Sequence, residues 1–66
     1  MNDMDKLRAL LPHWLEHNEE HAVEFRNWAD RACLAGQAAA AQEIHRAAEA
    51  MRQANDALQS ALTALD

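Results

Sequence analysis

Two amphipathic patterns of helical period run along the chain, one in each half. In each pattern mostly apolar side chains recur at alternating spacings of three and four residues, the period of a coiled-coil seam. The first row contains Leu7, Leu11, Trp14, Asn18, His21, Phe25, Trp28 and Ala32. The second row contains Ile44, Ala48, Met51, Asn55, Leu58, Leu62 and Leu65. The pattern predicts two helices, over residues 3–34 and 37–65.

Gly36, the single glycine of the chain, lies between the two patterns. A glycine just after a helix often adopts the left-handed conformation that ends it. The alanine-rich segment that follows is again strongly helix-forming. We therefore expect a turn near Gly36 that folds the second helix back along the first as an antiparallel hairpin.

The register of this hairpin follows from the position of the turn. Asn18 then lies opposite Asn55, and two opposed amides in a seam can bond to each other and fix the register. The same register places Trp14 and Trp28 against the second helix, so both tryptophans are expected in the core.

Pro12 conflicts with the helical pattern of the first half. Inside a helix, proline lacks the amide hydrogen that would bind the carbonyl of Arg8. We therefore expect a kink or a break near residues 9–12. Asn2 or Asp3 can cap a short opening turn, and Pro12 itself is acceptable as the first residue of the long helix.

The small size of the chain indicates that the hairpin needs a partner. A single domain of 66 residues buries little apolar surface on its own. Small residues flank the second seam and leave room for another helix: Ala40, Ala47, Ala54 and Ala61. We expect an all-α fold in which the coiled-coil-like hairpin dimerises into a four-helix assembly. A solvated helix is the alternative, because alanine is also the strongest helix former.

The composition argues against several classes of function. The formal net charge is −5 and the six Lys and Arg residues are scattered, which does not suit nucleic-acid binding. No apolar stretch approaches the ~20 residues of a membrane span. A lone cysteine without a signal peptide indicates the reducing cytoplasm. An enzyme is not expected, because the chain has no Gly-rich loop and no serine beside a histidine.

His13, His17 and His21 form a ladder at a constant spacing of four residues. Two imidazoles at this spacing can bind one ion from a single turn of helix. His13 and His21 are ~12 Å apart along a straight helix, so all three serve one ion only if two copies cross antiparallel near His17. His13 and His17 of one chain then meet His21 of the other, and twofold symmetry generates two equivalent sites.

Other side chains near the ladder are candidates for supporting roles. Trp14, Glu20 and Glu24 can shield the ligands or bind them through hydrogen bonds. His45 is expected at the surface, and Cys33, ~24 Å of helix from the ladder, is expected to be a small, half-buried side chain. A solvated flank whose histidines have no ligand role stays open as the alternative.

The motif HW-x2-H-x3-H, formed by His13, Trp14, His17 and His21, resembles the signature of the CooJ family, the nickel chaperones of carbon monoxide dehydrogenase. The resemblance covers essentially the whole chain. It implies a homodimer that binds Ni(II) through the three histidines and delivers it to a recipient nickel enzyme or accessory protein.

Two points limit what the resemblance implies. Zn(II) and Cu(II) also accept nitrogen ligands at this spacing, so the spacing alone does not select nickel. CooJ-like proteins continue into a histidine-rich tail, whereas this sequence ends at Asp66, so the expected function rests on the motif. The alternative function is a structural coiled-coil module with incidental histidines.

Overall fold

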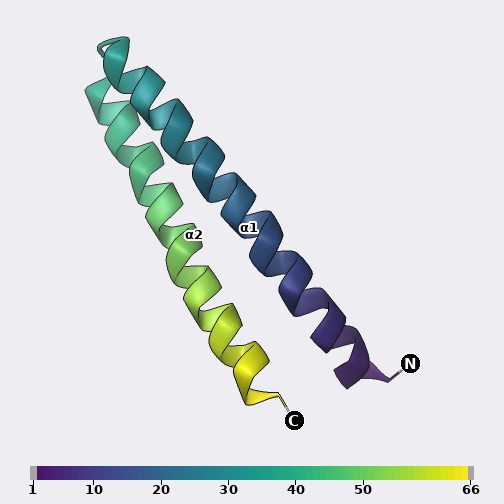
Figure 1. Cartoon of the computed structure of the whole chain (residues 1–66). Coiled ribbons are helices and arrows are strands. Elements are labelled where there is room, and N and C mark those ends of the chain that lie inside the picture. The colour runs from purple at the N-terminus through teal and green to yellow at the C-terminus, as the bar shows by residue number, and fades with distance from the viewer. Residues whose placement is uncertain (1, 66) are drawn as a thin grey trace.

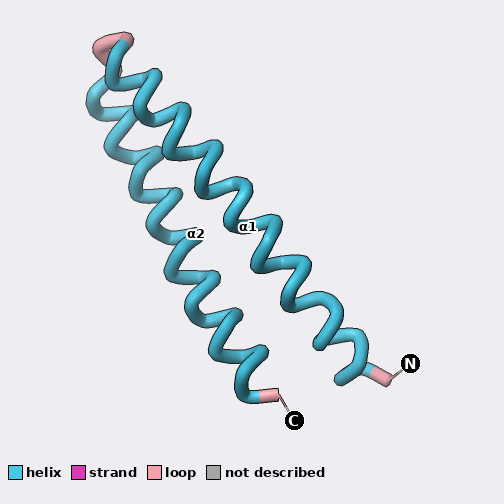
Figure 2. Tube along the Cα trace, in the orientation of Figure 1, coloured by secondary structure: helices cyan, strands magenta, loops and turns pink. Residues whose placement is uncertain are grey.

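The computed structural model describes residues 2–65 and contains two helices, α1 over Asp3–Leu34 and α2 over Ala38–Ala64. The helices run side by side in opposite directions, and the Cα trace extends 50 Å along its longest axis (Figure 1). Loop residues are confined to the turn and to the two ends (Figure 2). The predicted all-α hairpin is confirmed, while Met1 and Asp66 of the predicted domain lie outside the described residues. Over the described range, neither helix is long and apolar enough to cross a membrane.

α1 is continuous from its cap through Pro12. The Asn2 side chain accepts a hydrogen bond of 2.8 Å from the amide of Asp5 and so caps the helix. The helix does not break at Pro12, so the break expected at residues 9–12 is wrong. Pro12 and Arg8 are both exposed, and water can therefore hydrate the carbonyl that proline leaves without a donor.

The turn has the geometry of a Schellman motif. The amide of Gly36 donates to the carbonyl of Cys33 at 3.0 Å, and the amide of Gln37 donates to the carbonyl of Ala32 at 2.8 Å. Gly36 has a φ of +81°, a backbone conformation that residues with a Cβ rarely adopt. The turn predicted near Gly36 is therefore confirmed in position and in its physical cause.

Alanine fills much of the seam between the helices. The most buried side chains, each at most 4% exposed, are Leu11, Ala22, Ala29, Ala41 and Ala48. All seven seam residues predicted for the second helix are buried or half-buried. Small side chains on both sides of the seam allow the two helix backbones to approach closely.

α1 is rotated relative to the prediction. One predicted row is correct: Leu11, Asn18, Phe25 and Ala32 are buried or half-buried. In the other predicted row Leu7 and His21 are half-buried, but Trp14 and Trp28 are exposed. The residues one position further along are buried or half-buried: Leu15, Ala22 and Ala29. Trp14 is 39% exposed and Trp28 is 54% exposed, so their predicted role in the hairpin core is wrong. Close packing between alanines leaves no room for indoles in this seam.

Asn18 and Asn55 lie opposite each other, as predicted, and their role in setting the register stays a prediction. The side-chain amide of Asn18 donates to the side-chain oxygen of Asn55 at 3.0 Å. The amide of Asn55 donates in turn to the backbone carbonyl of Leu15, also at 3.0 Å. Both asparagines are half-buried, so these bonds satisfy polar groups that would otherwise destabilise the seam.

Candidate metal centre

The histidine ladder lies on a flank of α1 beside the seam. His13 and His17 are exposed, and His21 is half-buried. The nearly parallel rings of His13 and His17 have centroids 6.1 Å apart. The rings of His17 and His21 are perpendicular at 4.5 Å, and His21 stacks on Phe25 at 5.9 Å. Because Phe25 belongs to the seam, this stacking connects the ladder to the hairpin core.

Two of the three predicted ligands converge on one point. The Nε2 atoms of His17 and His21 are 3.0 Å apart, the distance of a hydrogen bond in which one ring donates its N–H to the other. Both nitrogens are therefore close enough together to serve one ion once that proton is displaced. His13 stacks beside His17 without joining this pair. Over residues 2–65, the structure contains no group of three or more His, Cys, Asp or Glu side chains arranged to hold a metal ion. One chain therefore contributes two convergent nitrogens.

Carboxylates surround the outer end of the ladder. A surface hollow is lined by His13, Glu16, His17 and Glu20. Glu20 thus lies beside the ladder as expected, and Glu16, to which the motif gives no role, lines the same hollow. Helical spacing predicts both positions. Glu16 follows His13 by three residues and Glu20 follows it by seven, so all three side chains lie on one face of α1.

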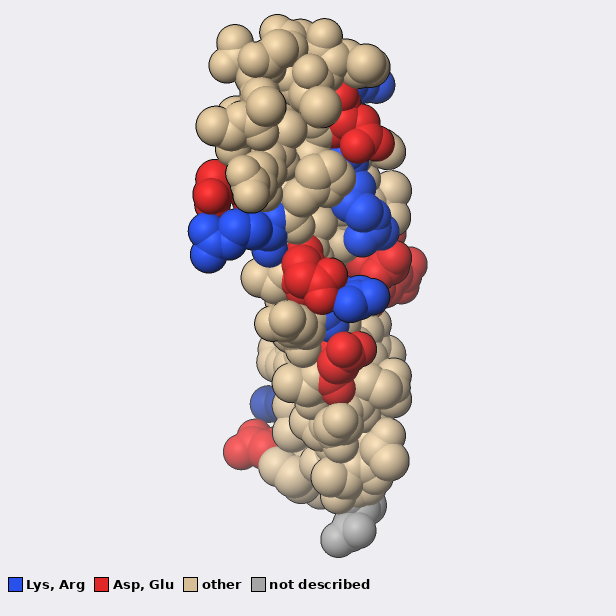
Figure 3. Space-filling model, turned by 90° about the vertical axis from the view of Figure 1, so that its left-hand side faces the viewer, with Lys and Arg blue, Asp and Glu red and all other residues tan. Residues whose placement is uncertain are grey.

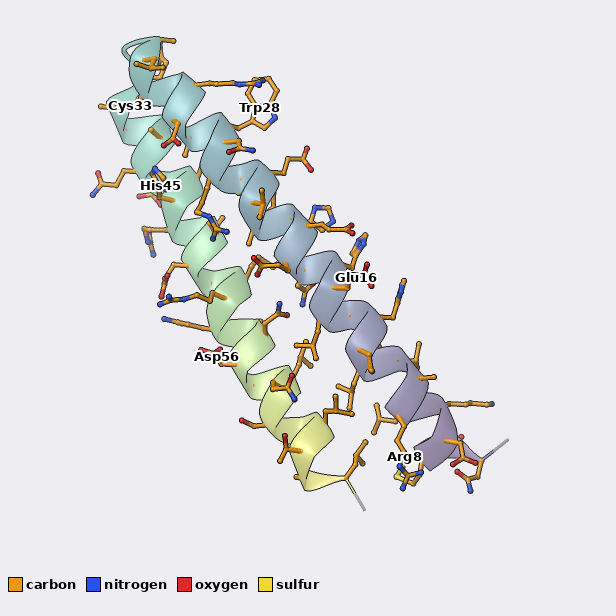
Figure 4. All side chains as sticks on the ribbon, viewed as in Figure 1. Arg8, Glu16, Trp28, Cys33, His45 and Asp56 are labelled. Carbon is orange, nitrogen blue, oxygen red and sulfur yellow. The ribbon has the colours of Figure 1, made fainter. Side chains whose placement is uncertain are left out.

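The two tryptophans lie outside the seam. Trp14 directly follows His13, the first histidine of the ladder. Trp28 carries the guanidinium of Arg31 above its ring at 4.6 Å. Trp28 stands clear of α2, and Glu16 projects from α1 away from α2 (Figure 4). Glu24, another expected supporting residue, is exposed.

The other candidate residues lie elsewhere on the hairpin. His45 is exposed on α2 and lies 3.6 Å from the carboxylate of Asp30, which agrees with its expected surface position. Cys33 is exposed, so the expectation of a half-buried thiol is wrong. It lies at the last turn of α1, where α2 has only begun to pack against it.

Comparison with known proteins gives one match. The family described as "Domain of unknown function (DUF8180)" matches residues 7–65, and the chain therefore belongs to this family. No curated protein and no solved structure matches the chain. The matched range contains the ladder, the turn and both asparagines of the register pair, so these features belong to the domain that defines the family.

Proposed function

We propose that this protein is a metallochaperone that carries Ni(II) at the interface of a homodimer and delivers it to a nickel enzyme such as carbon monoxide dehydrogenase. The ligands are histidines of the ladder: His13, His17 and His21. The observation that supports this proposal most directly is the 3.0 Å separation of the two Nε2 atoms of His17 and His21. The resemblance of the ladder to the CooJ motif supports nickel as the cargo.

The separation of these nitrogens suits a particular coordination geometry. An imidazole nitrogen binds a first-row divalent ion such as zinc at ~2.1 Å. Two such nitrogens at a right angle are ~3.0 Å apart, whereas the tetrahedral angle requires ~3.4 Å. Right angles belong to square-planar and octahedral complexes, and square-planar nitrogen sites are typical of Ni(II) and Cu(II). The separation is thus compatible with these two ions, and the resemblance to the CooJ motif is what supports nickel over Zn(II).

The position of the pair suits a carrier better than an enzyme. His17 is exposed and His21 half-buried on the flank of a helix, where a recipient protein can approach the ion. Two convergent nitrogens in one chain leave coordination positions to be filled by a second copy, by carboxylates of the hollow or by water. An ion held in this way is released when a recipient supplies competing ligands.

The apolar side chains around the ladder support a homodimer. Leu10, Trp14 and Trp28 are 42%, 39% and 54% exposed, and they occur on both sides of the histidines along α1. Exposed apolar side chains grouped on one face commonly mark an interface, and a domain this small gains stability from association. The same exposure favours the second candidate function, a structural coiled-coil module without a metal.

A nickel titration separates the two candidates. Calorimetry with Ni(II) on the intact protein is compared for the wild type, His17→Ala and His21→Ala. Loss of either ligand should weaken binding by more than the ~10 to 100-fold expected for a supporting residue. His45→Ala is the matched control, an exposed histidine outside the ladder, and should bind within about twofold of the wild type. Equal affinities for all four proteins would overturn the metal site and leave the structural module.

A further inference from the structure

α1 carries a second row of helical period beside its seam. The row contains Leu10, Trp14, His17, His21, Glu24 and Trp28. All are exposed except His21, which is half-buried. Successive members of the row are 4, 3, 4, 3 and 4 residues apart. This order is the same from either end, so the row is symmetric about residue 19. We propose that a second copy of this chain packs antiparallel on this row, with the twofold axis level with residue 19; this rests on the homodimer proposed above.

The side chains brought together by this axis are chemically matched. His17 lies opposite His21 of the partner subunit, so the two convergent pairs of imidazoles face each other. Leu10 lies opposite the partner's Trp28, which covers two exposed apolar side chains. Trp14 lies opposite the partner's Glu24, and the indole N–H is a donor for that carboxylate. Each position of the row therefore has a suitable counterpart.

The alanine stripe of α2 lies on the same face of the hairpin as this row. The stripe consists of Ala40, Ala47, Ala54 and Ala61, all of them exposed. On a helical wheel, the row and the stripe each lie about a quarter turn from their seam, on the same side of the hairpin. Asp30 and His45 lie about a quarter turn to the other side, and their 3.6 Å contact across the two helices marks the opposite face.

The third alanine of the stripe is level with the centre of the row. The bond between Asn18 and Asn55, in helices that run antiparallel, places residue 19 of α1 level with Ala54 of α2. The same axis therefore sets Ala54 opposite its own copy and Ala47 opposite Ala61 of the partner subunit. Small residues there let the two α2 helices pack as closely as the seam does.

The row and the stripe together indicate the register of the dimer and the molecule that covers this face, which is a second copy of the chain. They lie on different helices, and one twofold axis pairs all six positions of the row, sets Ala54 against its own copy and sets Ala47 against the partner's Ala61. This agreement suits a second copy of the chain, although Ala40 lies beyond the paired alanines. The row and the stripe together contain one charged residue, Glu24. α2 carries the ion pairs of Glu43 with Arg46 and of Glu49 with Arg52. Positive and negative side chains alternate over the middle of the molecule when it is turned by 90° from the view of Figure 1 (Figure 3). The crossing at His17 expected from the sequence would set the axis level with Asp56 instead of Ala54.

Distances between spin labels measure the register without any metal. One protein is labelled at the native Cys33, and the other is Asp5→Cys in a Cys33→Ala background. Both sites are exposed and are equally far from residue 19. The proposed axis predicts equal distances between labels of ~42 Å in both dimers. A crossing at His17 predicts ~36 Å for position 5 and ~48 Å for position 33, and a parallel dimer predicts two short distances; either result overturns the proposed register.

A substitution on the axis tests the same interface by its stability. Ala54→Lys sets two like charges against each other and should weaken the metal-free dimer tenfold or more in sedimentation equilibrium. Gln53→Lys adds the same charge to the neighbouring exposed position on another face and should leave the dimer within about twofold. Equal effects of the two variants, or a wild type that is monomeric at micromolar concentration, would overturn the proposal. If the protein forms the dimer in this register but binds no nickel, the proposed metallochaperone function is overturned and the proposed dimer is not.

Discussion

α1 carries two rows of the same period, the seam row that faces α2 and the exposed row beside it, which we call the outer row. Their side chains differ in size and polarity. The seam row that faces α2 is built from Leu15, Ala22 and Ala29, and the last two are at most 1% exposed. The outer row, one position earlier, carries Trp14, His21 and Trp28, with both tryptophans more than a third exposed. The hairpin therefore buries alanines between its helices and leaves both tryptophans at the surface. This division suits a protein whose functional contacts are made with other molecules.

Nickel affinity should depend strongly on pH, which is the largest effect we expect and concerns the outer row alone. A protonated imidazole cannot bind the ion, so the complex holds fewer protons than the free site and weakens as pH falls. With three or four imidazoles bound to each ion, affinity should fall by up to about 1,000 to 10,000-fold per pH unit once all of them bind protons in the free protein. Calorimetry in two buffers of different ionisation enthalpy counts the protons released. Less than one proton per ion near pH 6 would remove the histidines as the principal ligands.

Enlarging the seam row should destabilise the hairpin itself. Ala29 is 0% exposed, so Ala29→Phe must force the helices apart and should lower the free energy of unfolding by about 1 to 3 kcal/mol. Val23→Phe is the matched control, because Val23 lies on the same helix, is 44% exposed and belongs to neither row. It should change stability by less than about 0.5 kcal/mol. Urea unfolding measures both, and similar losses would contradict the tight packing of the seam.

The asparagine pair should matter for register more than for stability. Asn18→Ala removes the partner of the Asn55 side chain and should cost about 1 to 2 kcal/mol. Replacing both asparagines with Leu should raise the melting temperature and loosen the register or the oligomeric state. Amide NMR spectra of the double variant report this directly. A single sharp set of peaks would show that the register is fixed elsewhere.

The contact between Asp30 and His45 should contribute least. Their side chains are 72% and 49% exposed and their charged atoms are 3.6 Å apart, so solvent screens the pair. His45→Ala should change the free energy of unfolding by no more than about 0.5 kcal/mol. Thermal unfolding of this variant is therefore a reference for the larger effects on α1. A loss above 1 kcal/mol would show that this face is also part of an interface.

Local signals account for the parts of the fold that could be predicted. The turn at Gly36, the cap at Asn2 and the opposition of Asn18 and Asn55 each depend on residue types at fixed offsets. The rotation of α1 could not be predicted, because Trp14, His21 and Trp28 repeat with the same period as Leu15, Ala22 and Ala29. Large apolar residues are usually buried, and only packing against the alanines of α2 decides between the two rows.

The site was predictable to a similar degree. Convergence of His17 and His21 follows from their spacing on a helix, and the structure places their nitrogens 3.0 Å apart. The separate position of His13 depends on side-chain rotamers, which the spacing does not determine. Glu16 lines the hollow with His13 although the motif contains no residue at that position. In the proposed dimer the further ligands come from a second chain, a contact that the sequence of one chain indicates only through the symmetric spacing of its residues.

X-ray absorption at the nickel edge tests the central claim most directly, namely that the site is shared between two chains. Scattering from imidazole rings counts the histidines bound to each ion in the nickel-loaded dimer. One chain supplies two convergent nitrogens, so the account predicts three or four imidazoles per nickel. One or two imidazoles per nickel in an intact dimer would contradict a shared site.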